Sequence, residues 1–398
     1  MTGQPADAFA AHGVCSPRFE RLRQQFTRNL ATGVDLGASL AITVDGAFEV
    51  DLWGGWADEA RSRPWNTDTL TLTFSTTKMM AALAALVLVD RGALDLDARV
   101  AKYWPEFAAQ GKGEILVRHV LSHTSGVAGW QESLTMAEVC DWEKSTAMLA
   151  AQAPWWKAGT ASGYQLFCHG HLIGEIVRRV TGQKLAAFFA SDIAAPLGAD
   201  FHMGIQPENY HRLADHQQPT DRIPKVPLRL LIPLLFRSEG VVARSFKNPM
   251  HDPAYRLTDT FRQADIGAAN GYGNARSVGR ALSVLANGGS VDGVRLLKPK
   301  TIARIFEPQS KGIDRVLGIP ITWGIGWALS VPPILSFLPK DSKVFFWGGM
   351  GGSLTVIDLD RHMTISFVMN KLEGGIIGSP RVNKLLETAY ACLNDHKI

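Results

Sequence analysis

The stretch Leu70-Thr71-Leu72-Thr73-Phe74-Ser75-Thr76-Thr77-Lys78, followed by the uncharged run MMAALAALVLV at residues 79–89, decides the fold of this chain. Alanine, leucine and methionine favour helix, and a helix that is apolar on every side is a buried one. Ser75 is therefore expected in the first turn of a buried helix, with Lys78 one turn further along. Residues three apart share a helix face, so the Lys78 ammonium can reach the Ser75 hydroxyl.

Ser75 and Lys78 form an S-x-x-K pair, a pattern that fits nucleophilic catalysis. A serine hydroxyl is a weak nucleophile until a neighbouring base activates it. The apolar residues after Lys78 exclude water, and burial lowers the pKa of a lysine from about 10.4, which makes Lys78 a plausible proton acceptor. Because such a short pattern also occurs by chance, the alternative for an isolated match is an N-cap serine beside a solvated lysine.

The composition is that of a globular protein with no sign of nucleic-acid or metal binding. Of 398 residues, 46% are hydrophobic and 20% charged, and the basic residues behind the net charge of +4 are dispersed. Cys15, Cys140, Cys168 and Cys392 show no metal-ligand spacing, so we expect free thiols. Neither a signal peptide nor an apolar run of the ~18 residues that span a membrane is visible. We therefore expect a cytoplasmic protein without metal, cofactor, nucleic-acid partner or membrane span.

Strand patterns cluster at the two ends of the chain, and helical patterns lie mostly between them. Asp45-Gly46 joins two β-like runs in a hairpin pattern. The predicted strands cover residues 37–44, 47–53, 324–330, 343–347, 353–358 and 363–369. The predicted helices cover residues 18–30, 115–121, 142–153, 170–180, 276–286 and 381–393, and another begins at 185–189. One antiparallel sheet built from both ends, in an α+β protein, satisfies short connections.

Residues 205–265 lose clear periodicity and are rich in proline and basic residues. They include the run VPLRLLIPLLF at 226–236, which is too short to span a membrane. It could form a lid or pocket wall over an apolar ligand, or belong to the core, and the sequence favours neither.

Two further motifs line up with Ser75-x-x-Lys78. Tyr164 lies in a loop punctuated by glycine and serine, and Trp347-Gly348-Gly349 ends a strand that reads VFFW. This order and spacing resemble the serine β-lactamase and penicillin-binding-protein superfamily, above all the family VIII carboxylesterases, which look like class C β-lactamases. The segments LSHTSG at 121–126 and GMGGS at 349–353 match as well, and the resemblance spans roughly residues 20–390.

The resemblance implies a β-lactamase-like fold in two parts. Residues 1–72 and 300–398 would form an α/β region with the antiparallel sheet. Residues 73–299 would form a mainly helical region that carries Ser75, Lys78 and Tyr164, with the active site between the two parts.

The resemblance also implies a role for each motif residue. Ser75 would be the nucleophile, and Lys78 and Tyr164 would share the general-base and general-acid work. Which of the two starts deprotonated is open, because they titrate as a coupled pair. The remaining implied groups are the oxyanion-hole backbone N–H groups of Ser75 and Met350 and the substrate-binding residues Trp347, Gly348 and Gly349.

Two departures from class C β-lactamases bear on the substrate. Gln165-Leu166 follows Tyr164 where the Y-x-N motif has its asparagine, and Trp347 replaces the lysine of K-T-G, so recognition of an anionic lactam is weakened. The sequence therefore predicts a serine carboxylesterase that hydrolyses short to medium neutral esters through an acyl-enzyme on Ser75.

Several alternatives remain open. The same site could serve a β-lactamase, a D-alanyl peptidase or an acyltransferase, and the fold could serve a non-catalytic scaffold. His123, in a tight polar turn, is a candidate base, but a structural hydrogen-bonding role is favoured. The oligomeric state is not determined by the sequence, and a homo-oligomer is one option.

Overall fold

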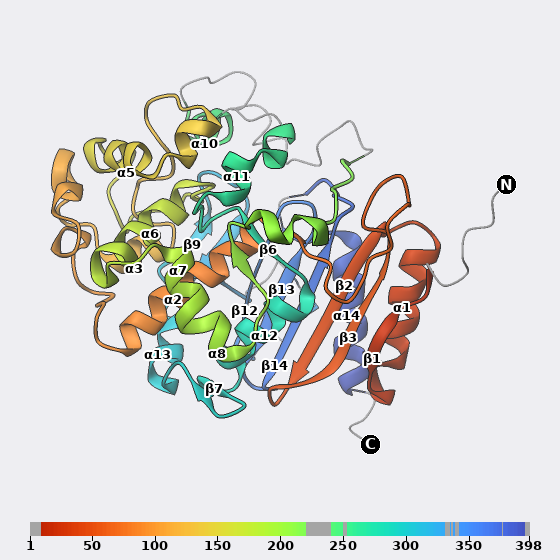
Figure 1. Ribbon diagram of the computed structural model, residues 1–398. Helices are drawn as coiled ribbons and strands as arrows, with labels where there is room; N and C mark the ends of the chain where they lie inside the picture. Colours follow the sequence, from red (N-terminus) through yellow and green to blue (C-terminus); the bar gives the residue numbers. More distant parts are fainter. Residues whose placement is uncertain are drawn as a thin grey trace.

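The computed structural model describes residues 9–219, 240–249, 253–330, 335, 337–338, 342–375 and 377–394. The apolar run at 226–236 lies outside these residues. Within them, nine strands form one antiparallel sheet in the order β1-β3-β2-β14-β13-β12-β11-β10-β9 (Figure 1). The strands are β1 (His12–Cys15), β2 (Gly37–Val44), β3 (Ala47–Gly55), β9 (Ser310–Ile313), β10 (Pro320–Trp323), β11 (Ala328–Leu329), β12 (Val344–Gly348), β13 (Leu354–Asp358) and β14 (Met363–Met369).

The sheet unites the two ends of the chain, which confirms the predicted α+β architecture. Its central pairing joins β2 to β14, with Val44 opposite Met363 and Ala38 opposite Met369. The hairpin between β2 and β3 turns at Asp45 and Gly46, whose φ values are 50° and 84°. Both values lie in the left-handed region that a tight hairpin turn requires.

The strand predicted at residues 324–330 is wrong in its bounds. The structure has β10 before it, a turn, and then the two-residue strand β11. Gly326 has a φ of 88°, and a Cβ on Gly324 would lie 2.0 Å from the carbonyl oxygen of Ile305. The backbone therefore turns where the alternation of residues suggested a continuous strand. The short edge strands β1 and β9 have no clear sequence pattern, because most of their residues are at least partly exposed.

Helices cover both faces of the sheet. On one face, α12 (Ala275–Ala286) lies against β2, β13 and β14, and the backbone N–H of Ala275 donates to Ser39 Oγ at 2.9 Å. On the other face, α1 (Glu20–Ala31) packs against α14 (Pro380–Asn394), as Figure 1 shows. The helices from the two ends of the chain therefore pack together on the same face of the sheet.

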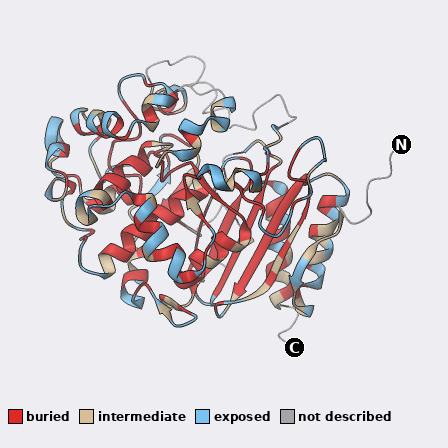
Figure 2. Cartoon of the chain, viewed as in Figure 1, coloured by how far each residue is buried: buried red, intermediate tan, exposed pale blue. Residues whose placement is uncertain are grey.

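The helical region is built around α2 (Thr77–Asp90), which is buried from residue 77 to 88 (Figure 2). It packs against α6 (Cys168–Thr181). The other helices are α3 (Val117–Leu121), α4 (Met136–Cys140), α5 (Trp142–Ala151), α7 (Leu185–Phe189), α8 (Ala195–Leu197), α10 (Val241–Lys247), α11 (Asp259–Gln263) and α13 (Pro299–Ala303). The small strands here are β4 (Thr71–Leu72), β5 (His202–Met203), β6 (Gly271–Gly273), β7 (Ser290–Val291) and β8 (Val294–Arg295).

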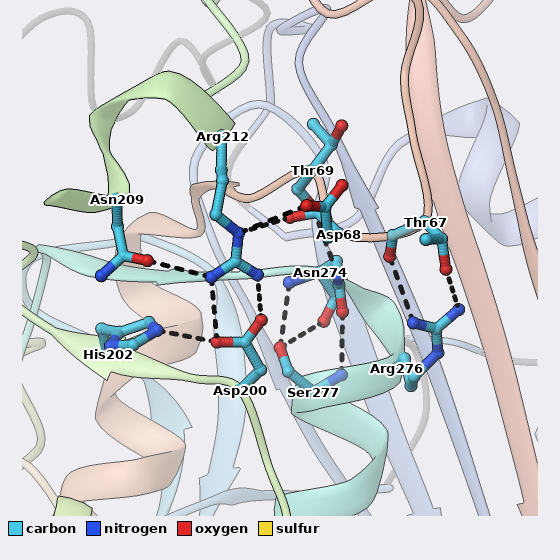
Figure 3. Close-up of polar contacts among 10 residues, drawn as sticks. All are labelled: Thr67, Asp68, Thr69, Asp200, His202, Asn209, Arg212, Asn274, Arg276 and Ser277. Atoms are coloured by element: carbon cyan, nitrogen blue, oxygen red, sulfur yellow. Dashed lines mark hydrogen bonds and ion pairs between the residues drawn. The ribbon is translucent and has the colours of Figure 1, made fainter.

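A polar network fixes the segment that leads to Ser75 (Figure 3). Asn274 caps α12 by accepting the Ser277 backbone N–H at 3.0 Å, and its amide donates to the carbonyl oxygen of Thr69 at 3.2 Å. Arg212 forms an ion pair with Asp200 beside them. The N-terminus of α12 and the approach to β4 are thereby tied together.

Two sequence-based expectations about side chains and segments can be compared with the structure. Within the described residues all four cysteines are free; Cys168 and Cys392 are buried, and Cys15 and Cys140 are partly buried. Across the described ranges, no helix is both long and apolar enough to cross a bilayer. The division into a sheet region and a helical region at residues 72 and 300 stays a prediction.

Candidate active site

Ser75 lies in a one-turn 3-10 helix, Phe74–Thr76, directly before α2 rather than in the first turn of α2 itself. Phe74 has a φ of 50°, a conformation that costs energy for a bulky residue and that clusters at functional sites. Thr73 anchors the turn from below, because its backbone N–H and its hydroxyl donate to the Gly271 carbonyl at 2.8 and 3.0 Å. The turn that carries Ser75 is therefore held by β6.

The end of β12 meets this turn at close range. A Cβ on Gly349 would lie 2.2 Å from the Thr73 carbonyl oxygen, so only glycine fits. Ser353 Oγ lies 3.1 Å from Thr76 Oγ1 and donates to the Thr73 carbonyl at 3.3 Å. The next residue after Gly349, Met350, lines the same cavity as Ser75.

Lys78 is buried and faces Ser75 from the first turn of α2. Its Nζ lies 3.3 Å from Ser75 Oγ and donates to the carbonyl oxygens of Leu166 and Ala268 at 2.7 and 2.9 Å. Burial lowers the pKa of Lys78 to about 7. A neutral amine has two N–H donors for the two carbonyls and one lone pair. That lone pair is left for the Ser75 hydroxyl.

Tyr164 is the third side chain of the site, and its pKa is shifted in the opposite direction from that of Lys78. Its hydroxyl accepts the indole N–H of Trp347 at 3.0 Å, and its ring centroid lies 4.8 Å from Lys78 Nζ. Burial raises the pKa of Tyr164 well above its usual value of 10, and hydrogen bonds with Ser75 and Trp347 lower it only in part. The phenol keeps its proton where the amine can lose one, which favours Lys78 as the resting base.

Trp347 acts through Tyr164 in this arrangement. The indole is 4% exposed, and its N–H is used by the Tyr164 hydroxyl. Among the described residues that line the cavity, Met350 is present while Trp347, Gly348 and Gly349 are not. The substrate-binding role of residues 347–349 stays a prediction, and the polar contact that the Trp347 side chain makes is with Tyr164.

Asp314 is a buried carboxylate that sequence analysis missed. Its Oδ1 accepts the backbone N–H of Tyr164 at 3.0 Å, and its Oδ2 accepts the indole N–H of Trp323 at 3.2 Å. Trp323 stacks parallel to the Tyr164 ring, with centroids 6.0 Å apart. Asp314 thus positions both the backbone of Tyr164 and the ring that supports it. No sequence signal marks it, because it stands 150 residues from Tyr164 in a turn without a motif.

His123 supports the site from behind rather than acting in it. It is buried, its Nδ1 accepts the backbone N–H of Gln165 at 3.2 Å, and its ring centroid lies 4.8 Å from that of Tyr164. Burial lowers the pKa of His123 well below 6.5. The Gln165 amide donates to Ser125 Oγ and to the Val127 carbonyl, away from Lys78. The structural interpretation of His123 and the missing Y-x-N amide are both consistent with these contacts.

A cavity of about 290 Å³ opens beside Ser75 and is mostly apolar. Its described lining includes the aromatic residues Phe74, Phe167, Phe246, Tyr255 and Phe261. Trp155 and Trp156 are not in that described lining. Across the described chain, no three side chains of the metal-ligating kinds gather to hold an ion.

A serine whose hydroxyl lies beside a buried lysine and near a tyrosine is the side-chain set of a serine hydrolase. The Beta-lactamase family model matches residues 24–379, and the chain belongs to the β-lactamase family. It is 37% identical to a family VIII carboxylesterase crystal structure, with a TM-score of 0.88 and coverage of 96% of this chain and 99% of that one.

Curated relatives carry related names. The chain is 32% identical over 363 residues to the esterase/beta-lactamase LipL of Mycobacterium tuberculosis, covering 90% of this chain and 83% of LipL. It is 28% identical over 361 residues to the esterase EstB of Burkholderia gladioli, covering 85% of this chain and 86% of EstB. These likenesses confirm the family and fold expected from the sequence.

Proposed function

We propose that this protein is a serine carboxylesterase that forms an acyl-enzyme on Ser75. The observation that carries the proposal is the Lys78 amine, buried 3.3 Å from Ser75 Oγ with its other donors directed at two carbonyls. The esterase names of the relatives above support this choice within the family.

The first half-reaction begins with proton transfer from Ser75 to the Lys78 amine. Ser75 Oγ attacks the ester carbonyl, and the backbone N–H groups of Ser75 and Met350 would receive the developing negative charge. Two such donors would lower the barrier by roughly 3 kcal/mol each. Both residues line the cavity, which supports their pairing.

Departure of the alcohol needs a proton, and in this proposal Tyr164 gives it. The phenol holds its proton at neutral pH, and Trp347 occupies one acceptor position of its oxygen. The Lys78 ammonium then returns a proton to the Tyr164 oxygen. In the second half-reaction the same groups take a proton from water, which attacks the acyl-enzyme and releases the acid.

The neutral character of the ester follows from what stands next to the scissile carbonyl. A β-lactam carries a carboxylate beside its reacting amide, and burying that charge without a cation is costly. The indole of Trp347 stands where K-T-G enzymes have a lysine, and its N–H already binds Tyr164. We therefore expect short to medium carboxylic esters to react much faster than lactams. The cytoplasmic location stays a prediction.

The decisive test is Ser75→Ala, assayed with p-nitrophenyl butyrate beside nitrocefin. We expect ester turnover to disappear while the thermal unfolding temperature is kept, because only one hydroxyl is deleted. Fluorophosphonate labelling followed by mass spectrometry should mark Ser75 in the wild type. Residual ester turnover within tenfold of wild type would contradict the assignment, and an unlabelled Ser75 would indicate a scaffold. Equal turnover rates on nitrocefin and p-nitrophenyl butyrate would favour a β-lactamase over an esterase.

A further inference from the structure

Arg256 is a cation in the wall of the Ser75 cavity. It belongs to the 3-10 helix Pro253–Leu257, and its guanidinium lies 5.4 Å from the centroid of the Phe74 ring. Phe74 immediately precedes Ser75, and all three residues line the cavity. The Phe74 ring therefore lies between the guanidinium and Ser75.

The guanidinium of Arg256 is poorly satisfied by its surroundings. Its Nε donates to the Pro253 carbonyl at 2.9 Å, whereas its Nη1 is buried and has no hydrogen-bond partner within the described residues. No carboxylate of the described chain lies within ion-pair distance. Asp215 lines a neighbouring cavity together with Arg256, but its carboxylate binds Arg63 at 2.7 Å.

Two described titratable groups near Arg256, His216 and Tyr272, are neutral. Burial and the charge of Arg256 lower the pKa of His216 to about 3, and this ring packs on Phe74 with centroids 5.1 Å apart. Burial raises the pKa of Tyr272 well above 10, so it also carries no charge at neutral pH. Neither residue can neutralise the guanidinium.

Elsewhere the chain pairs its buried arginine. Arg381 is 5% exposed and binds the buried carboxylate of Asp35 at 2.8 Å. A partly buried charge without a partner is costly, and burial lowers the pKa of Arg256 for that reason. A carboxylate is the ligand that a guanidinium fork binds best, through two parallel hydrogen bonds. Within the described residues no carboxylate pairs with Arg256, so the cavity offers an anion site there.

We propose that Arg256 binds a carboxylate at the far end of the acyl group, so that the enzyme also hydrolyses monoesters of dicarboxylic acids. This proposal rests on the proposed esterase function and extends it. It does not restore lactam binding, because the Phe74 ring separates the cation from Ser75, whereas a lactam carboxylate sits beside the reacting bond. A flexible acyl chain can reach past that ring.

The test compares p-nitrophenyl monoesters of the C4 to C8 diacids with neutral esters of similar shape. In the neutral esters an isopropyl group replaces the carboxylate. For at least one chain length, we expect wild-type kcat/KM to favour the monoester at least fivefold over its neutral counterpart. Arg256→Met, which removes the guanidinium but keeps an unbranched side chain, should abolish that preference mainly through KM. It should leave p-nitrophenyl butyrate hydrolysis within about twofold of wild type.

Two further variants separate recognition from general effects. Arg256→Lys keeps the charge but not the fork, so it should retain an intermediate preference. Arg91→Met removes a cation that pairs with Asp192 outside the cavity, and it should retain the full preference. The proposal is overturned if no chain length favours the monoester, or if Arg256→Met lowers both ester classes in proportion. Loss of the esterase function itself would show as no turnover of any ester, a different result.

Discussion

Lys78 and Lys112 are both buried lysines whose side-chain nitrogen has three polar neighbours. The two differ in the third neighbour, which is a serine hydroxyl for Lys78 and a backbone carbonyl for Lys112. Each is at most 1% exposed, and burial lowers the pKa of both, to about 7 for Lys78 and about 8 for Lys112. Lys112 Nζ donates to three backbone carbonyls, those of Ala109, Ala150 and Gln152. Lys78 Nζ meets two carbonyls and the Ser75 hydroxyl.

A lowered pKa alone does not make a lysine catalytic. A carbonyl oxygen accepts a hydrogen bond but has no proton to give, so Lys112 is locked as a structural donor. A hydroxyl can also give up a proton, so the position of Lys78 beside Ser75 supports its proposed role as the base. A lysine with a lowered pKa is therefore a catalytic candidate only when a proton donor lies within reach.

The largest expected effect tests this difference directly. Lys78→Met should lower kcat/KM for p-nitrophenyl butyrate by a factor on the order of 10³ to 10⁴, because it removes the proton acceptor. Lys112→Met, the same change at the matched site, should leave kcat/KM within about twofold. Comparable losses in both variants would mean that the two lysines act through stability alone.

Lys112→Met should instead appear in the unfolding free energy. It leaves three buried carbonyls without their donor, at a cost of about 1–3 kcal/mol. Urea unfolding followed by tryptophan fluorescence measures this change. A variant as stable as wild type would show that the carbonyls find other donors.

The second expected effect concerns the proton that Tyr164 supplies. Tyr164→Phe should lower kcat by a factor on the order of 10², because the leaving alcohol loses its acid. Trp347→Phe removes the indole N–H that the Tyr164 hydroxyl accepts and makes the aromatic ring smaller, so it is the control for positioning and should cost less. Steady-state kinetics on p-nitrophenyl esters checks both. A Tyr164→Phe enzyme with normal kcat would assign both proton transfers to Lys78.

The smallest expected effect is the pH dependence. The neutral amine of Lys78 is the active form, so kcat/KM should rise with pH through about 7 and then level off. Lysines with lowered folded-state pKa bind fewer protons folded than unfolded, so the unfolding free energy should rise from pH 8 towards the unfolded pKa of about 10.4. Lys112→Met should flatten that stability slope and leave the rate profile unchanged. A rise of kcat/KM with a midpoint near pH 8 that disappears in Lys112→Met would contradict this assignment, because it would make Lys112 the base and Lys78 the structural lysine.

Much of the fold could be predicted because its signals are local. The uncharged run after Lys78 marks α2 as buried, and Asp45-Gly46 marks the central hairpin. The missed elements have weak local signals: β1 and β9 are four-residue edge strands, and the turn at Gly326 interrupts a run that alternates like a strand. Their position is decided by pairing with distant segments, which one stretch of sequence does not encode.

The site divides in the same way. Ser75, Lys78 and Tyr164 stand in recognisable motifs, so the sequence identified them as candidates. Asp314 and Arg256 have no motif and act through contacts across more than a hundred residues, with Tyr164 and Phe74 respectively. The choice between Lys78 and Tyr164 as base also needed the structure, because burial moves their pKa values in opposite senses.

The pairing of β2 with β14 has a consequence for how the chain matures on the ribosome. Residues 37–44 must wait for residues 363–369 before the sheet can close, a delay on the order of tens of seconds at typical rates of synthesis. During that time β2 is an exposed apolar edge, the kind of surface that invites aggregation. Because Gly349, in the late segment, packs closely against the Thr73 carbonyl, the turn that carries Ser75 is also completed last. The nascent chain thus needs its β2 edge shielded from aggregation until β14 has been synthesised and the sheet can close.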